Sequence, residues 1–179
     1  EYVDLGLNVK WATMNVGASS PEDYGDYFAW GETTPKIISS YNWLEYKYCS
    51  GTYNSLTKYN NSSSYGIVDN KTILEMSDDA AHANWGGSWR MPTDDEWTAL
   101  RLQCTWTMTT LNGIEGYNVT SNSNGNSIFL PSVSRSIYYD GCYWSSSLNN
   151  DNPSRGWCVH LLSRQVLRDN YDRYDGLTV

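Results

Sequence analysis

The middle of the chain contains the stretch Gly87-Ser88-Trp89-Arg90-Met91-Pro92-Thr93-Asp94-Asp95-Glu96-Trp97. Thr93 and Glu96 have the spacing of a capping box, in which each side chain bonds the main chain of the other at a helix start. Trp97 and Leu100 then follow at helical spacing, which predicts one apolar face. We therefore expect a helix to begin directly after Thr93.

Weaker signals on both sides of this stretch predict the remaining elements. A second helix is expected over residues 78–85, with Ser77 as its N-cap and Gly86-Gly87 as a left-handed exit. Apolar and aromatic runs predict strands at residues 2–9, 27–30, 117–119, 127–131, 142–145 and 157–163. Residues 33–70 are rich in Ser, Asn, Tyr and Gly and predict long irregular loops. Two early helices followed by strands favour an α+β fold with a mainly antiparallel, twisted sheet.

The whole-chain composition limits the classes of protein. At 179 residues the chain is expected to form a single domain. Its net charge of −8 argues against a nucleic-acid or anionic-membrane partner. No segment approaches the roughly 20 apolar residues that cross a bilayer, so we expect any export signal or anchor to lie outside this chain.

The segment 132–176 uses a restricted set of amino acids. It contains no Lys, Glu, Met, Thr, Ala or Phe, although Lys, Glu and Met together occupy 16 of the first 131 positions. Ser, Tyr, Asp, Asn and Arg are frequent instead. A surface strand tolerates Lys and Glu as well as Arg and Asp, so folding stability alone does not select this set. The segment 1–131 is expected to be the scaffold, and the tail the region that carries function.

The alternation of residue types within the tail also separates scaffold positions from variable ones. In the run 157–164, Trp157, Val159 and Leu161 are suited to a core, whereas the residues between them are chemically unrelated. Successive side chains of a strand point to opposite faces. The sequence therefore predicts one constant, buried face and one exposed face that is free to vary.

Several stretches resemble a known fold. The stretch 87–97, followed by Ile128-Phe129-Leu130-Pro131 and Tyr143-Trp144-Ser145-Ser146-Ser147, resembles the C-type-lectin-like fold of bacterial surface proteins and formylglycine-generating enzymes. The segments 3–13 and 78–87 are similar to a related domain of gut-associated anaerobes. The resemblance covers nearly the full length of the chain.

Within this fold the tail looks most like the variable proteins of diversity-generating retroelements. In such systems template adenines are miscopied, so Asn codons become codons for Ser, Tyr, Asp, Gly, Cys, His, Arg, Ile, Leu or Val. The alphabet of the tail matches that outcome. Trp144, Trp157 and Gln165 depart from it and are assigned to the constant scaffold.

The resemblance implies a non-catalytic domain that binds extracellular protein or glycan ligands, at a bacterial cell surface or, alternatively, on a phage virion. Tyr and Leu are expected to anchor the ligand, and Arg and Asp to orient it. The predicted ligand-binding residues are Ser134, Arg135, Ser136, Ile137, Tyr138, Tyr139, Asp140, Cys142, Ser154, Arg155, Cys158, His160, Leu162, Arg164, Leu167, Arg168, Asp169, Tyr171, Asp172, Tyr174 and Asp175. For residues 167–176 a solvated loop of paired Arg and Asp is the alternative to a binding surface. The alternative for the whole chain is an undiversified adhesin or glycan-binding domain of the same fold.

Catalysis and metal binding receive less support from the sequence. Formylglycine-generating enzymes use two closely spaced cysteines, whereas Cys142 and Cys158 are 16 positions apart. The tripeptides of calcium-dependent sugar binding are absent, although residues 149–153 could supply oxygen ligands or form an Asx turn. No cofactor is expected, and structural calcium remains an alternative. Cys49 and Cys104 could form a disulfide in an exported protein, but an even cysteine count does not establish one.

Overall fold

The computed structural model describes residues 1–132 and 141–179. Its helices are α1 (Ala80–Trp85) and α2 (Asp94–Gln103), together with the 3-10 turns η1 (Ile38–Ser40), η2 (Ser63–Tyr65) and η3 (Met76–Asp78). Its strands are β1 (Tyr2–Val3), β2 (Trp11–Ala12), β3 (Tyr27–Phe28), β4 (Cys104–Leu111), β5 (Ile114–Ser121), β6 (Ser127–Pro131), β7 (Cys142–Leu148), β8 (Arg155–Leu162), β9 (Gln165–Asp172) and β10 (Leu177–Thr178).

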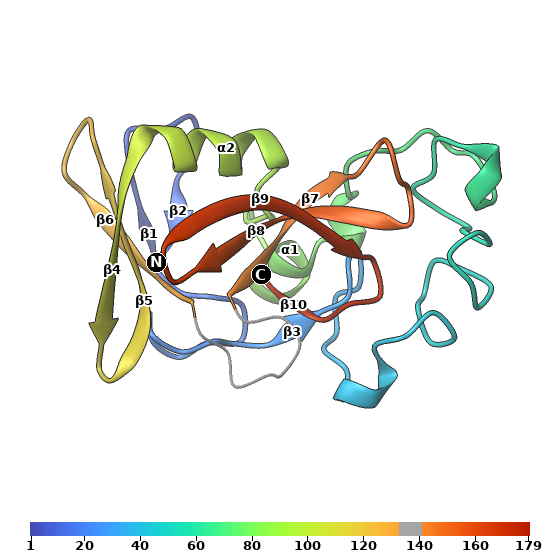
Figure 1. The fold of residues 1–179 in the computed structure, drawn as a ribbon, viewed down its shortest axis with the longest axis horizontal. Coiled ribbons are helices and arrows are strands. Elements are labelled where there is room, and N and C mark those ends of the chain that lie inside the picture. Colours follow the sequence, from blue (N-terminus) through green and yellow to red (C-terminus); the bar gives the residue numbers. More distant parts are fainter. Residues whose placement is uncertain (133–140) are drawn as a thin grey trace.

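The described strands form three sheets (Figure 1). The largest has the order β3-β10-β7-β8-β9, the second β4-β5-β6, and the third β1-β2. Strand pairing is antiparallel except between β10 and β7. The prediction of mixed helices and strands with mainly antiparallel sheets is confirmed.

The strands β7 and β8 are buried on both faces. Cys142, Trp144 and Cys158 point into one apolar cluster, which also contains Trp30 and Leu177. Alternate residues of the same strands, Tyr143, Val159 and Leu161, point into a second cluster with Trp97 of α2 and Val119 of β5. The centre of the large sheet is therefore an inner layer between two cores. The expected division of β8 into one buried and one exposed face does not hold at its middle.

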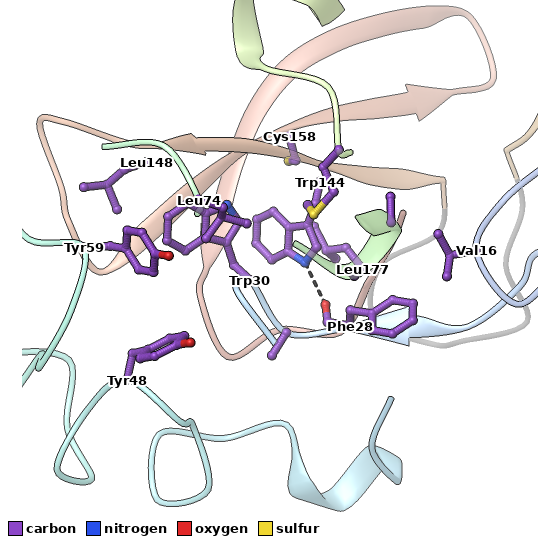
Figure 2. Packing of buried hydrophobic residues seen from close by; sticks show 14 of the residues in the cluster. Val16, Phe28, Trp30, Tyr48, Tyr59, Leu74, Trp144, Leu148, Cys158 and Leu177 are labelled. Carbon is purple, nitrogen blue, oxygen red and sulfur yellow. Dashed lines mark hydrogen bonds between the residues drawn. The ribbon is translucent and has the colours of Figure 1, made fainter. Parts of the chain in front are cut away.

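Aromatic side chains in the first cluster direct their polar atoms to main-chain carbonyls. The Trp144 Nε1 donates to Phe28 O at 2.7 Å (Figure 2). The Trp30 Nε1 donates to Ser145 O at 2.8 Å. Tyr59 meets the Trp30 ring edge-on at a centroid distance of 5.3 Å. Each ring therefore buries apolar area without leaving its polar group unsatisfied, as buried Trp and Tyr require.

The segment between β3 and α1 has no β-strand and only short 3-10 turns, as its composition predicts. It lies at the opposite end of the molecule from β4, β5 and β6 (Figure 1). A buried carboxylate organises it: Asp78 accepts from Lys58 Nζ at 2.6 Å and from the Tyr59 hydroxyl at 2.7 Å. Although burial opposes ionisation, the hydrogen bonds from Lys58, Tyr48 and Tyr59 hold the pKa of Asp78 well below its ordinary value.

The two predicted helices are present, and one begins later than expected. The capping box of Thr93 and Glu96 is formed, and Trp97 and Leu100 are buried on one face of α2, as predicted. For α1 the N-cap is Asp79 instead of Ser77, since the Asp79 carboxylate accepts from the main-chain N–H of His82 at 2.9 Å. The preceding residues 76–78 form η3. A β-region residue with an accepting side chain is needed at an N-cap, and here only Asp79 fulfils both conditions.

One strand prediction was wrong at its limits, and one strand was not predicted. The strand expected over residues 2–9 ends at Val3, because Gly6 adopts a left-handed φ of 70° and the Asp4 side chain bonds its N–H. Part of the run 167–176, for which a binding surface and a solvated loop were the two alternatives, belongs to β9, which pairs with β8 over its whole length. Arg and Asp in this run therefore lie on a strand whose main chain is already hydrogen-bonded.

The four cysteines are all within the described residues, and no disulfide joins any of them. Cys49 lies against the first cluster and Cys104 belongs to the second, so the possible pairing between them is not formed. Within residues 1–132 and 141–179, neither α-helix has the length and apolar character of a membrane span.

Candidate ligand-binding surface

The hairpin of β8 and β9 provides the framework of the predicted site. Its pairing runs without interruption from Arg155 opposite Asp172 to Leu162 opposite Gln165. The turn at residues 163–164 closes the hairpin, and β9 is the edge strand of the large sheet. The main chain is thus held by its own ladder, and the side chains of β9 can change with little effect on that ladder.

One face of the hairpin is tied to α2. The Arg168 guanidinium carbon lies 3.3 Å from the centroid of the Trp157 ring. The same guanidinium donates to both carboxylate oxygens of Asp94, at 2.8 to 2.9 Å. Arg168, predicted to orient a ligand, therefore also joins the hairpin to the first turn of α2. Trp157, predicted to be a core residue, is only partly buried because Arg168 covers it instead of a second apolar layer.

The other face carries a small polar group at the margin of the first cluster. The His160 Nδ1 lies 3.3 Å from the Tyr171 hydroxyl and 3.5 Å from Asp169 Oδ2. Burial raises the pKa of Tyr171 above its ordinary value, so its phenol is neutral at physiological pH. This arrangement can offer hydrogen bonds to a ligand, but the phenol is not an activated nucleophile or base.

Four predicted ligand-binding residues are buried, and their assignment was wrong. Cys142 and Cys158 are each 1% exposed, because both faces of β7 and β8 are covered. Ser154 is buried in a turn, where its hydroxyl donates to Asn152 Oδ1 at 2.7 Å. Asp175 is 3% exposed, in the turn before β10. Burial also raises the pKa of the Cys158 thiol well above its ordinary value, which leaves it protonated.

The end of the tail is structural as well. Arg173 is completely buried, although it lies in the run predicted as a binding surface or a solvated loop. Its Nε donates to the Tyr46 hydroxyl at 2.9 Å, and its Nη atoms donate to the carbonyls of Tyr59, Pro153 and Lys58 at 3.0 to 3.2 Å. This arginine fastens the end of the large sheet to the loop-rich segment.

The other predicted residues in the described part of the chain are at least partly exposed. We call this set the hairpin surface: Arg155, His160, Leu162, Arg164, Leu167, Arg168, Asp169, Tyr171, Asp172 and Tyr174. Tyr171 and Tyr174 also pack against the first cluster, so they are held in place on one side. The predicted residues Ser134, Arg135, Ser136, Ile137, Tyr138, Tyr139 and Asp140 lie outside the described residues, and their role stays a prediction.

A cavity of about 610 Å³ lies elsewhere, between the N-terminal segment and the two helices. Trp11 contacts Trp97 at a centroid distance of 4.9 Å, and Trp85 contacts Trp89 at 5.2 Å. We call this space of about 610 Å³ the aromatic cavity. Its lining residues are Tyr2, Val9, Lys10, Trp11, Ala12, Met14, Asn15, Ala81, Trp85, Ser88, Trp89, Arg90, Met91, Pro92, Glu96, Trp97, Ile128, Leu130, Tyr143 and Val179.

The charges around the aromatic cavity largely cancel. Arg90 donates to both carboxylate oxygens of Glu96, at 2.5 and 2.8 Å. Burial opposes the ionisation of Glu96, but these hydrogen bonds outweigh that effect and lower the pKa of Glu96 below its ordinary value. A cavity of this size with aromatic walls and a few polar groups is typical of small-molecule sites. This cavity is not predictable from the sequence, because only the fold brings Trp11 next to Trp97. The spacing of Trp85, Trp89 and Trp97 was the one available signal.

Metal ligation finds little support in the described part of the chain, where no group of three or more His, Cys, Asp or Glu side chains could hold an ion. The run 149–153 had two interpretations, a source of oxygen ligands for a cation or an Asx turn, and the structure shows the Asx turn. The Asn149 side-chain oxygen accepts from the N–H groups of Asp151 and Asn152, at 3.1 and 3.3 Å. This oxygen is therefore already used within the turn.

Comparisons of the chain with models of protein families, with curated proteins and with solved structures found no match.

Proposed function

We propose that the chain is a non-catalytic ligand-binding domain of the C-type-lectin-like class, whose hairpin surface is diversified by a retroelement to recognise extracellular ligands at a bacterial cell surface. One observation carries the proposal: the restricted alphabet of the tail occupies a hairpin whose backbone is held by its own ladder. Variation on such a strand changes what the surface binds without removing main-chain hydrogen bonds.

The chemistry of the hairpin surface suits recognition. Tyr171 and Tyr174 offer rigid, amphipathic area, and Leu162 and Leu167 offer apolar contacts at small entropic cost. Arg155 pairs with Asp172 at 3.2 Å, and both remain partly exposed, so they can exchange this bond for one with a ligand. Antibody paratopes use the same combination of aromatic anchors and adaptable polar groups.

Burial narrows the set of positions at which diversity is useful. A changed residue at Cys142, Cys158 or Arg173 would disturb a packed core or remove several hydrogen bonds at once. We therefore expect these codons to be constant, even though Cys and Arg are both reachable from an Asn codon. Variation is expected at the hairpin surface and in the segment 134–140.

Sequencing the locus in sibling isolates tests the proposal. We expect substitutions to be confined to adenine-derived codons at the hairpin surface and in residues 134–140, beside a near-copy template and a reverse-transcriptase gene. Substitutions scattered evenly over all 179 positions, with no template nearby, would contradict the proposal. Frequent replacement at Arg173 or Cys158 would contradict the expectation that buried positions stay constant. It would not contradict diversification of the tail.

The aromatic cavity favours a second candidate, an undiversified glycan-binding or adhesin domain of the same class. Apart from Tyr143 and Val179, its lining belongs to the scaffold, so its ligand would be constant. A glycan-array screen with Trp89→Ala and with Leu162→Ala separates the two candidates. Loss of binding only in Trp89→Ala supports the cavity, whereas loss only in Leu162→Ala supports the hairpin surface.

A further inference from the structure

Two arginines have no partner among the described residues of this acidic chain. The sequence contains 20 Asp and Glu against 12 Lys and Arg. Within the described residues, ion pairs engage Lys36, Lys47, Lys58, Lys71, Arg90, Arg155 and Arg168. The Arg173 guanidinium is hydrogen-bonded, and the Lys10 ammonium lies over the ring of Tyr2. Of the described Lys and Arg residues, this leaves Arg101 and Arg164 with neither an ion pair nor a hydrogen bond.

Both arginines line one cavity of about 260 Å³. It lies where the end of α2 meets β4, β5 and the turn of the hairpin. Its lining residues are Arg101, Leu102, Trp106, Tyr117, Arg164, Gln165 and Val166, and we call it the arginine cavity. One arginine comes from the last turn of the scaffold helix and the other from the hairpin turn, so the fold assembles the pair.

The polar groups of the two aromatic side chains in this cavity are already used. The Trp106 Nε1 donates to Leu100 O at 3.3 Å, and the Tyr117 hydroxyl donates to Leu162 O. None of the lining residues is an Asp or Glu. The cavity therefore presents two guanidinium groups and the amide of Gln165 beside aromatic and aliphatic walls. Such a site attracts a negatively charged group and disfavours a cation.

The arginine of α2 also carries an unsatisfied atom. The Arg101 Nε is buried and has no acceptor among the described residues. A buried donor without a partner destabilises the protein, and a ligand that supplies the acceptor removes that penalty. The planar guanidinium fork matches the two oxygens of a carboxylate or a sulfate.

We infer that the arginine cavity binds the carboxylate or sulfate group of an acidic extracellular glycan. Its volume lies below the roughly 300 to 1,000 Å³ of small-molecule pockets, which suits one terminal sugar residue. Trp106, which is partly exposed, can cover the apolar side of a sugar ring, whereas a flexible acidic side chain of a peptide would leave this ring uncovered. The inference rests on the proposed function, because Arg164 belongs to the hairpin surface.

Titration calorimetry with three oligosaccharides of one backbone tests this inference. One carries a carboxylate, one a sulfate and one neither group, and the two charged forms show which oxyanion is preferred. We expect a charged form to bind at least about tenfold more tightly than the neutral one, and Arg101→Gln or Arg164→Gln to remove about tenfold each. Lys71→Gln is the matched control: it removes one positive charge far from the cavity and should change affinity less than about twofold.

Conservative variants separate specific recognition from general attraction. Arg101→Lys and Arg164→Lys keep the charge but lose the planar fork, so we expect them to bind the charged form more weakly than wild type. Equal binding of charged and neutral oligosaccharides would overturn the inference. So would an acidic peptide that competes for the two arginines more strongly than the acidic oligosaccharides do.

Inorganic sulfate provides a test that needs no glycan. Compared with sodium chloride at equal ionic strength, sulfate should raise the melting temperature of wild type more than that of the double variant Arg101→Gln/Arg164→Gln. An identical shift in both proteins would show only the general exclusion of sulfate from protein surfaces and would overturn the inference. If the locus shows diversification of the hairpin surface but the protein has no preference for anions, this inference fails and the proposed function stands. Conversely, anion binding at an undiversified locus would contradict only the proposed diversification.

Discussion

The hairpin of β8 and β9 and the turn that follows it are drawn from the same restricted alphabet, but they have opposite roles in the structure. On the hairpin, Arg155 and Arg164 point outward and are at least partly exposed. In the turn, Arg173 and Asp175 are buried, and Arg173 donates to four acceptors, three of which belong to the loop-rich segment. The difference teaches that the position in the sheet, and not the composition of the segment, decides which of these residues can face a ligand.

The largest expected effect concerns the turn. Arg173→Ala leaves several buried acceptors unpaired and should lower the free energy of unfolding by about 3 to 5 kcal/mol. Arg155→Ala, on the hairpin, should cost less than about 1 kcal/mol because its ion pair is partly exposed. Urea denaturation of both variants measures the contrast. Similar losses in the two variants would remove the distinction between turn and hairpin.

A second contrast lies within the hairpin. Cys158→Ser places a hydroxyl in an apolar cluster and should cost about 1 to 3 kcal/mol. His160→Ala, two residues further along the same face, should cost less than about 1 kcal/mol, since the ring lies at the margin of the cluster. Thermal unfolding of the two variants gives the comparison. A larger loss for His160→Ala would show that the margin of the cluster at His160 is structural after all.

Acid should loosen the turn before the hairpin. The pKa of Asp78 is lowered in the folded state, so its contribution to stability is present above its ordinary pKa of 3.8 and is lost as pH falls below that value. Asp78 holds Lys58 and Tyr59, whose carbonyls accept from Arg173. Between pH 6 and pH 3 wild type should lose about 1 to 2 kcal/mol through this carboxylate, and Asp78→Asn should show a shallower pH dependence.

Hydrogen exchange locates this acid effect. At pH 3 the amide of Arg173, which bonds Ser154 O, should lose protection before the amide of Leu161, which bonds Gly141 O. Asp95→Asn, at an exposed position of α2, is the control and should leave the order unchanged. Simultaneous loss of protection at both amides would mean that the turn and the hairpin open as one unit.

The smallest expected effect tests the contact between the hairpin and α2. Arg168→Ala removes the stacking on Trp157 and the pair with Asp94 and should cost about 0.5 to 1 kcal/mol, because the site is partly exposed. The difference between the tryptophan fluorescence spectra of the variant and wild type should show a shift to longer wavelength, because the ring of Trp157, one of nine tryptophans, becomes more hydrated. An unchanged spectrum would show that Arg168 does not cover the ring in solution.

Local signals predicted the elements with strong termini. The capping box at Thr93 and the apolar face of α2 follow from side-chain spacing alone, and both are present. The strands β5, β6, β7 and β8 were also predicted, since turn residues and apolar runs mark them, whereas no range was predicted for β4. The start of α1 was missed, because both Ser77 and Asp79 can cap a helix and the surrounding main chain decides between them. The strand at residues 165–172 was missed because paired Arg and Asp also occur in solvated loops.

By itself the sequence determined the mixed fold with antiparallel pairing and the restricted composition of the tail, because helix caps, periodicity and residue usage are local properties. Only the tertiary structure decided which tail residues are accessible. Stacking cores on both faces of β7 and β8 buries Cys142 and Cys158, and packing of the loop-rich segment against the end of the sheet buries Arg173. It also brought together Arg101 and Arg164, which are distant in the chain. Burial depends on what covers a strand from elsewhere in the chain, and alternation within a single strand carries no information about that cover.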